Sequence, residues 1–166
     1  MQLSARHRGQ GFALLDAALA LALLSGGALA LLWLGQQHLI TQRQQLARET
    51  AMLLAQDLVE RIHLNATQAP RYAQAWSTVA APAADCQRSA CTRIELAAWD
   101  VQQWRQRVRT ELPQGDASVF AASSPLGWWG VVLAWQDDGQ SLRTDPSGAT
   151  PECPVAHSCW RLWFRP

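Results

Sequence analysis

Apolar residues dominate one continuous stretch near the N-terminus, Phe12–Leu34, which consists mainly of Ala and Leu. As a helix with a rise of 1.5 Å per residue, this stretch spans roughly 35 Å, enough to cross a hydrocarbon core about 30 Å thick. Only a few residues interrupt it, namely Asp16, Ser25, Gly26 and Gly27. The pattern predicts a membrane-spanning helix close to the N-terminus.

The helical pattern continues beyond this stretch, but its character changes. Strong helix formers follow from Gln36, and no proline occurs before Pro70. Apolar residues recur at three- and four-residue steps and form one stripe, made of Ala47, Ala51, Leu54, Leu58 and Ile62. We therefore predict one helix from Phe12 to His63, apolar all round in its first half and amphipathic in its second.

Four polar residues lie near the end of this helix: Asp57, Glu60, Arg61 and Asn65. They admit two interpretations, an acid–base cluster or a solvated helix face on which Asp57 and Arg61 pair four residues apart. We expect the solvated face.

The remainder of the chain predicts a small α+β domain. Residues 66–92 are rich in Ala, Pro, Gln and Ser and indicate a loop. Thr92 and Glu95 form a capping box that begins a second helix, which Pro113 and Gly115 end. Its core-facing stripe is Ala97, Val101, Trp104, Val108 and Leu112.

A two-residue periodicity then predicts strands at 117–121, 128–136 and 159–165. The turn signals between them are Ser-Pro-Leu-Gly, Asp-Asp-Gly and Asp-Pro-Ser-Gly. In the last strand Trp160, Leu162 and Phe164 share one face. That face can bury against the long helix, which gives an antiparallel sheet packed on a helical spine. We expect Trp163 and one of Trp128 and Trp129 on the outer face.

The four cysteines form two close pairs, Cys86/Cys91 and Cys153/Cys159. An even number of cysteines in local pairs suits disulfides in an oxidising compartment. Three connectivities are open. Chain entropy predicts a stabilisation of about 2 kcal/mol for each short bridge and about 4 kcal/mol for a bridge between the two pairs. Proximity in the sequence instead favours the two local bridges. The rival is a zinc site that includes His157, but the ligand spacings are irregular, and we expect no metal.

The N-terminal residues decide between three kinds of membrane segment. Residues 1–11 are polar and carry Arg6 and Arg8. After the apolar stretch the first arginine is Arg43. Positive charges before the apolar stretch rather than directly after it favour a cytoplasmic N-terminus. A secretory signal cleaved after Ala30 is one interpretation, and a plain anchor is another. Neither explains Asp16, since a charge near the centre of a membrane helix costs about 2.5–3.5 kcal/mol.

The string Gly11-Phe12-Ala13-Leu14-Leu15-Asp16 resembles the processing site of type IV prepilins, in which a basic leader ends in Gly and an acid stands at the fifth mature position. The resemblance implies that a prepilin peptidase cleaves between Gly11 and Phe12 and methylates the new Phe12 amine. It also implies that Asp16 pairs with the terminal amine of a neighbouring subunit during assembly. Most family members have Glu at this position, whose side chain is one methylene longer.

Two further strings, Leu54–Arg61 and Leu96–Pro113, resemble the minor pilins called PilV, or type IV pilus modification proteins. This resemblance implies a minor pilin in pilus initiation and assembly, with other minor and major pilins as partners through the N-terminal helix. The implied organisation is a leader (1–11), a transmembrane half-helix (12–35), an amphipathic half-helix (36–65) and a periplasmic domain (66–166). The implied location is the inner membrane and then a pilus or pseudopilus. A minor pseudopilin of a type II secretion system shares this N-terminal pattern and stays open.

Other classes of function have less support in the sequence. The net charge is +1 and no basic face is evident, so we expect no nucleic-acid partner. No Ser/His/Asp order, metal motif or phosphate-binding Gly loop is present, so we expect neither catalysis nor a cofactor. A secreted or membrane-anchored binding domain shares every downstream feature, and only the processing site distinguishes it.

Overall fold

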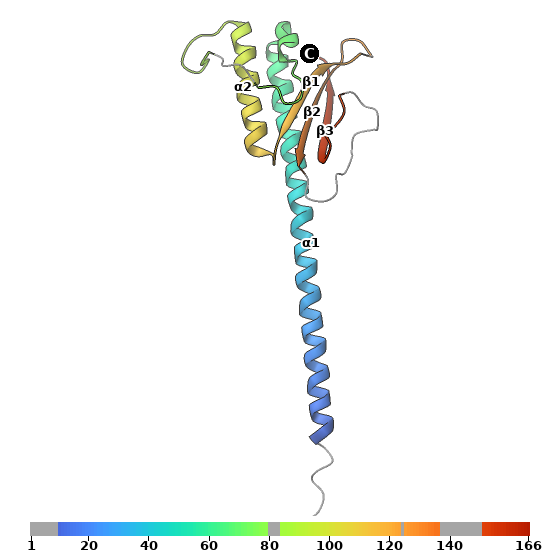
Figure 1. The fold of residues 1–166 in the computed structure, drawn as a ribbon. Helices are drawn as coiled ribbons and strands as arrows, with labels where there is room; N and C mark the ends of the chain where they lie inside the picture. The colour runs from blue at the N-terminus through green and yellow to red at the C-terminus, as the bar shows by residue number, and fades with distance from the viewer. Residues whose placement is uncertain (1–9, 80–83, 124, 137–150) are drawn as a thin grey trace, which may run out of the picture. The chain divides into compact units, whose positions relative to one another are not determined.

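A computed structural model describes residues 10–79, 84–123, 125–136 and 151–166 (Figure 1). Most of the predicted leader, residues 1–11, lies outside these ranges, as do the Asp-Asp-Gly and Asp-Pro-Ser-Gly turn signals. The chain forms two compact units, residues 1–43 and 44–166. The element order is helix α1, 3₁₀ helix η1, helix α2 and strands β1 to β3, which is the predicted α+β fold.

Helix α1 runs from Gln10 to Leu64, close to the predicted bounds. In the first unit the apolar side chains of α1 that the structure describes are exposed, among them Leu14, Leu23 and Trp33. Among the described residues it is the one helix long and apolar enough to cross a membrane, judged by length and composition. A helix that is apolar all round and has no covering layer is typical of a membrane span.

In the second unit α1 is amphipathic, as its sequence predicts. Ala51, Leu54, Leu58 and Ile62 are fully buried, and Ala47 packs against the same core. Residues three and four apart lie on one face of a helix, so the stripe faces one way. This part of α1 is therefore the spine of the second unit.

The segment predicted as a loop, residues 66–92, contains more structure than its composition indicates. Helix η1 spans Ala66–Tyr72 and buries Ala69 and Tyr72. Gln74 then forms an isolated antiparallel bridge with Val119 of β1. Short 3₁₀ turns are common connectors, and here the buried Tyr72 ring gives the turn its tertiary anchor.

Helix α2 spans Arg93–Glu111 and begins with the predicted capping box. The Thr92 side chain accepts from the Glu95 backbone N–H, and the Glu95 carboxylate accepts from the Thr92 backbone N–H. Every member of the predicted stripe from Ala97 to Leu112 is buried. After the helix Gly115 passes so close to the Val108 carbonyl that a Cβ at this position would overlap it.

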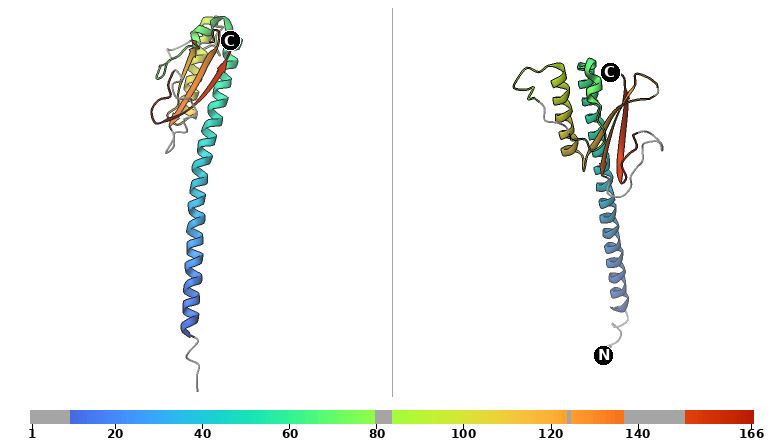
Figure 2. Two further views of the ribbon diagram at one scale, coloured as in Figure 1. Left: turned by 90° about the vertical axis from the view of Figure 1, so that its right-hand side faces the viewer. Right: turned by 45° about the horizontal axis from the view of Figure 1, so that its top comes forward.

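The three strands are β1 (Asp116–Ala121), β2 (Trp129–Gln136) and β3 (His157–Phe164). They pair antiparallel in the order β1-β2-β3, with Val119 opposite Val131 and Val131 opposite Leu162. Each strand lies within two residues of its predicted bounds. Figure 2 shows the sheet alongside the C-terminal part of α1, with α2 beside the same part of that helix.

Both faces of the central strand are buried, whereas the sequence pattern indicated one buried face. The inner face joins the main core, to which Val131, Leu133 and Phe164 contribute. The outer face carries a second cluster of Val132, Ala134 and Cys159. Three partly buried side chains pack against this cluster: Trp76, Phe120 and Cys153. The cover comes from distant parts of the chain, which strand periodicity does not reveal.

Candidate functional site

The first unit carries the residues of the predicted processing and assembly site. Gly11 and Phe12 lie in the first turn of α1, which begins at Gln10. Asp16 is exposed, one turn further along, and Leu14, Leu15 and Leu19 around it are exposed as well. Within the described ranges Asp16 forms no ion pair or hydrogen bond. Among the residues that the structure describes, this carboxylate in an apolar segment therefore has no partner.

The glycine pair of α1 is likewise uncovered by the part of the chain that the structure describes. An ideal Cβ placed on Gly26 or Gly27 would meet no atom within 4 Å. Ser25 precedes the pair, and its hydroxyl donates to the Ala22 carbonyl at 3.0 Å. No described residue of this chain packs against the pair, and such exposed small residues are typical of helices that pack closely against a second membrane helix.

In the second unit a set of polar residues joins α1, η1 and α2, and we call it the polar network; its members are Asp57, Arg61, Asn65, Tyr72 and Asp100. Arg61 Nε donates to Asp57 Oδ2 at 3.1 Å, and Arg61 Nη1 donates to Asp100 Oδ1 at 2.9 Å. Tyr72 Oη donates to the second Asp100 oxygen at 2.8 Å. The Asp100 carboxylate, whose side chain is 8% exposed, thus has a charged and a neutral donor.

Two members of the network have shifted proton affinities. Burial raises the pKa of Tyr72 well above its ordinary value, and the hydrogen bond that Tyr72 donates to Asp100 raises it further. Burial lowers the pKa of Arg61, but its hydrogen bonds with Asp57 and Asp100 outweigh this effect, so the pKa is raised overall. Both groups keep their protons over the whole physiological range.

Asn65 completes the network at the end of α1. Its side chain is buried, and its Nδ2 donates to the Arg93 carbonyl at 2.8 Å and to Tyr72 Oη at 3.4 Å. The first contact reaches the N-terminal turn of α2. The network therefore joins the end of α1 to both the beginning and the middle of α2.

The prediction of a solvated helix face at Asp57 and Arg61 is only half right. The two residues do pair, but Arg61 also reaches the buried Asp100 on another helix. The sequence contained a signal for this: Asp100 lies three residues after Ala97, next to Val101, and so falls on the buried face of α2. A charged residue on a core face needs a partner, and Arg61 provides it.

A second buried ion pair joins α2 to β1. Arg105 is 3% exposed, and its Nη2 donates to Asp116 Oδ1 at 2.7 Å, while its Nη1 donates to the Ala117 carbonyl at 3.0 Å. Burial lowers the pKa of Arg105, and the Asp116 charge opposes this shift. Arg105 follows Trp104, whose indole donates to the Leu54 carbonyl at 2.7 Å. Neighbouring α2 residues therefore attach the helix to the sheet and to α1.

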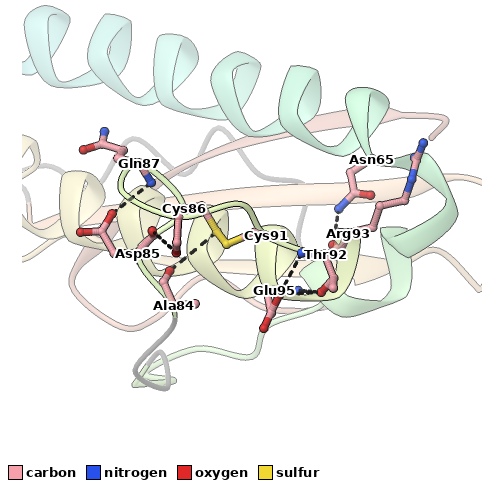
Figure 3. The surroundings of a disulfide bond; sticks show 10 residues. Asn65, Ala84, Asp85, Cys86, Gln87, Cys91, Thr92, Arg93 and Glu95 are labelled. Atoms are coloured by element: carbon pink, nitrogen blue, oxygen red, sulfur yellow. Dashed lines mark hydrogen bonds between the residues drawn. A yellow bond between two sulfur atoms is a disulfide. The ribbon is translucent and has the colours of Figure 1, made fainter.

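Each cysteine bonds within its local pair. Cys86 joins Cys91, with their Cα atoms 5.5 Å apart, and Figure 3 shows this bridge directly before the Thr92 cap of α2. Asp85 beside the bridge accepts from the Gln87 N–H at 3.0 Å. The loop before α2 is therefore held by a covalent bridge and a cap in succession.

The second bridge joins Cys153 to Cys159, with their Cα atoms 6.0 Å apart. Cys159 is buried in β3, so the bridge fixes the chain that enters this strand. All four sulfurs are used in bridges, so none is a thiolate ligand for zinc in this state. In the part of the chain that the structure describes, no three His, Cys, Asp or Glu residues gather around a metal-sized space.

The outer face of the sheet carries exposed aromatic side chains near the end of β3. Trp163 is 44% exposed and borders a pocket of about 330 Å³ together with Trp128, Ala122 and Pro125. The Arg165 guanidinium lies 5.1 Å from the centre of the Trp128 ring. Trp129 instead packs against the main core, so Trp163 and Trp128 are the pair left near the surface.

The histidines that the structure describes show no catalytic arrangement. His63 Nε2 lies 2.7 Å from the Arg165 carbonyl oxygen, and its ring contacts Phe164 edge-on. His38 is exposed on α1, and His157 begins β3 with its Nδ1 2.9 Å from the Val155 carbonyl oxygen. A carbonyl oxygen only accepts, so these contacts are structural hydrogen bonds that a neutral ring can donate.

Comparison with known proteins supports a pilin-type subunit. The profile of a family described as type IV pilin Tt1218 matches residues 39–102. No curated protein and no solved structure matches the chain significantly. The family match supports a type IV pilin-like protein, a class whose members are structural subunits rather than enzymes.

The matched range covers less than half of the chain, but it includes the helical part of the second unit that surrounds the polar network. It contains α1 from Leu39 onward, η1, the Cys86–Cys91 bridge and the first half of α2. All five residues of the polar network fall inside it. The match ends before β1 and begins after Asp16, so it is independent of the N-terminal pattern.

Proposed function

We propose that this chain is a type IV prepilin whose mature form is a minor pilin in pilus initiation and assembly. The single observation that carries the proposal is Asp16, a carboxylate in the apolar part of α1, five residues after Gly11, that has no partner among the residues the structure describes. The family match at residues 39–102 supports the same class from a separate part of the chain.

In this proposal the peptidase removes residues 1–11 and leaves Phe12 with a free amine that is then methylated. The mature N-terminus lies four residues before Asp16, about one helical turn away. An ammonium from a neighbouring subunit pairs with the Asp16 carboxylate and offsets the cost of its charge in the membrane, about 2.5–3.5 kcal/mol. The pairing fixes the axial register of two subunits.

The second unit is proposed to lie in the periplasm and then on the filament. Basic residues before the apolar segment favour a cytoplasmic N-terminus, which places residues 44–166 on the opposite side. Two disulfides suit that oxidising compartment. The likeness of the strings Leu54–Arg61 and Leu96–Pro113 to PilV proteins supports a minor rather than a major subunit.

The test is the intact mass and N-terminal sequence of the full chain, expressed in cells with and without a prepilin peptidase. We expect a chain that begins at methylated Phe12, seen only with the peptidase. A matched pair of variants assigns the cleavage: Gly11→Val should block processing, and Ala30→Leu, which blocks the alternative signal-peptidase site, should not. A chain that begins at Leu31 regardless of the peptidase would contradict the proposal and indicate a secreted domain.

A further inference from the structure

A second pocket, of about 600 Å³, opens at the end of the sheet where β1 and β3 begin. Four segments line it: residues 76–77, Arg109 near the end of α2, the turn at 114–116, and parts of the segment 152–157. The volume is within the range of small-molecule sites, about 300–1,000 Å³. The processing and assembly role proposed for Gly11, Phe12 and Asp16 does not involve this pocket.

The backbone around the pocket is held in a costly conformation at three positions. In the part of the chain that the structure describes, the non-glycine residues with positive φ are Ser77 (56°), Gln114 (46°) and Ala156 (60°). Two of them line the pocket, and Ala156 directly precedes the lining residue His157. Such residues cost about 1 kcal/mol or more each, and they cluster at binding sites in proteins.

Specific bonds hold these segments in place. The Ser77 N–H donates to Asp116 Oδ2 at 2.7 Å. The Gly115 N–H donates to the Leu112 carbonyl at 3.0 Å, which closes the turn at Gln114. The Cys153–Cys159 disulfide closes a short loop of the chain that contains Ala156. The pocket wall is therefore formed in advance of any ligand, which reduces the entropy cost of binding.

The pocket presents two opposite charges that do not pair with each other. Arg109 donates from Nη2 to the Thr78 carbonyl at 3.1 Å and has no carboxylate partner within the described ranges. Glu152 is exposed and forms no hydrogen bond or ion pair with the described residues. Asp116 is not available, because Arg105 and the Ser77 N–H already occupy its two oxygens.

The other lining groups suit a small polar ligand. Trp76 gives an aromatic wall, and its indole N–H is buried without an acceptor among the described residues. Ser77 and Gln114 add a hydroxyl and an amide, and both side chains are exposed. A few polar groups beside one aromatic surface are typical of sites that fix the orientation of a small molecule.

We propose that this pocket binds a small zwitterion, with its anionic group at Arg109 and its ammonium at Glu152. A guanidinium presents several N–H donors in a fixed fork that matches a carboxylate or a phosphate. A carboxylate such as that of Glu152 accepts from an ammonium and balances its charge. Two sources have this chemistry: the termini of a short peptide and a phosphoethanolamine headgroup.

The test is isothermal titration calorimetry on the full chain in detergent micelles, with O-phosphoethanolamine and dialanine as zwitterionic probes. Inorganic phosphate and ethanolamine each carry one of the two charges. We expect at least one zwitterion to bind at least tenfold more tightly than either single-charge probe. Tighter binding of O-phosphoethanolamine indicates a headgroup site, and tighter binding of dialanine indicates a peptide site.

Variants assign the two charges. Glu152→Gln should weaken the preferred zwitterion at least tenfold without affecting the fold, since Glu152 is exposed and forms no hydrogen bond or ion pair with the described residues. Arg109→Gln should do the same, and Arg93→Gln, an exposed arginine outside the lining, is the matched control. Absence of binding by both zwitterions would overturn the proposal. Equal affinity for phosphate and O-phosphoethanolamine, unaffected by Glu152→Gln, would also overturn it.

Discussion

Arg61 of α1 and Asp100 of α2 form an ion pair with 2.9 Å between Nη1 and Oδ1, although they lie 39 residues apart in the chain. Asp100 is almost fully buried, and Arg61 is three-quarters buried. Removing one partner of such a pair leaves a charge in a medium that solvates it poorly. The pair therefore favours one position of α2 against the C-terminal part of α1 over others that would separate the two charges.

The first prediction concerns this pair. Arg61→Gln should lower the free energy of unfolding of the second unit by about 2 kcal/mol, because it leaves the Asp100 charge with Tyr72 as its one remaining donor in the network. Guanidinium unfolding of the full chain in micelles, followed by near-ultraviolet circular dichroism, measures the change. Arg107→Gln is the matched control: Arg107 pairs with Asp57 at 3.2 Å but its side chain is 45% exposed, so the loss should stay below about 1 kcal/mol. Equal effects of the two variants would contradict the role of burial.

The second prediction is an alkaline loss of stability that Tyr72 causes. Its pKa is raised in the folded state, so the folded chain binds the phenolic proton more tightly than the unfolded chain does. This contribution is fully present below pH about 10, the ordinary tyrosine value, and is lost as the pH rises toward the folded value. Tyr72→Phe should remove this pH dependence and cost about 1 kcal/mol at neutral pH through the lost hydrogen bond to Asp100.

The titration can be read directly, because Tyr72 is the single tyrosine of the chain. The ultraviolet absorbance of phenolate should appear only at a pH above the ordinary tyrosine range, together with loss of the near-ultraviolet dichroism. Phenolate that forms near pH 10 in the folded chain would show that Tyr72 is accessible to solvent and would contradict its burial.

Local sequence patterns predicted most of the fold, and the reason is visible in particular residues. The Thr92–Glu95 cap and the stripe from Ala97 to Leu112 depend on positions a few residues apart, so the sequence alone defines α2. The strands likewise follow from two-residue alternation. The second cluster on the outer sheet face did not follow, because Trp76 covers Val132 from more than fifty residues away.

The site was predictable to a different degree in each unit. The N-terminal residues Gly11, Phe12 and Asp16 form a short linear pattern that can be recognised from the sequence alone, and their roles in processing and assembly stay a prediction. The polar network depends on how α1, η1 and α2 meet, so Arg61 looked like half of a surface pair until Asp100 was placed beside it. Tyr72 gave no signal, since it lay in a segment whose composition indicated a loop.

The third prediction compares the two disulfides. The pairs close loops of similar length, with sequence separations of 5 and 6, so chain entropy assigns each about 2 kcal/mol. The double variant Cys153→Ala/Cys159→Ala should cost about 1 kcal/mol more than Cys86→Ala/Cys91→Ala, because Cys159 is buried against Val132 and Ala134. Unfolding of both double variants under oxidising conditions measures the difference. A larger loss of unfolding free energy in the Cys86→Ala/Cys91→Ala variant would contradict this prediction. It would mean that the loop before α2 contributes more to the stability of the fold than its packing indicates.

The fourth prediction tests the proposed role of Asp16. Asp16→Asn should leave cleavage after Gly11 intact but reduce recovery of the subunit in sheared filaments at least tenfold, since an amide keeps the shape and loses the charge that attracts the terminal amine. Asp16→Glu should preserve assembly, because its charge is the same and its reach is one methylene longer. The measurement is the amount of mature chain in filament and membrane fractions, determined by quantitative mass spectrometry.

A second polar residue of the apolar segment, Ser25, separates the effect of charge from that of polarity. Ser25→Ala removes a hydroxyl that bonds within its own helix, to the Ala22 carbonyl, and should change neither processing nor incorporation. If Asp16→Asn enters filaments as well as the unaltered chain does, the carboxylate is not an assembly contact. If Asp16→Asn instead prevents cleavage, Asp16 acts at the peptidase step, and the register between subunits must depend on other contacts of α1. Both outcomes differ from the loss of filament incorporation after normal cleavage that the unpartnered charge predicts.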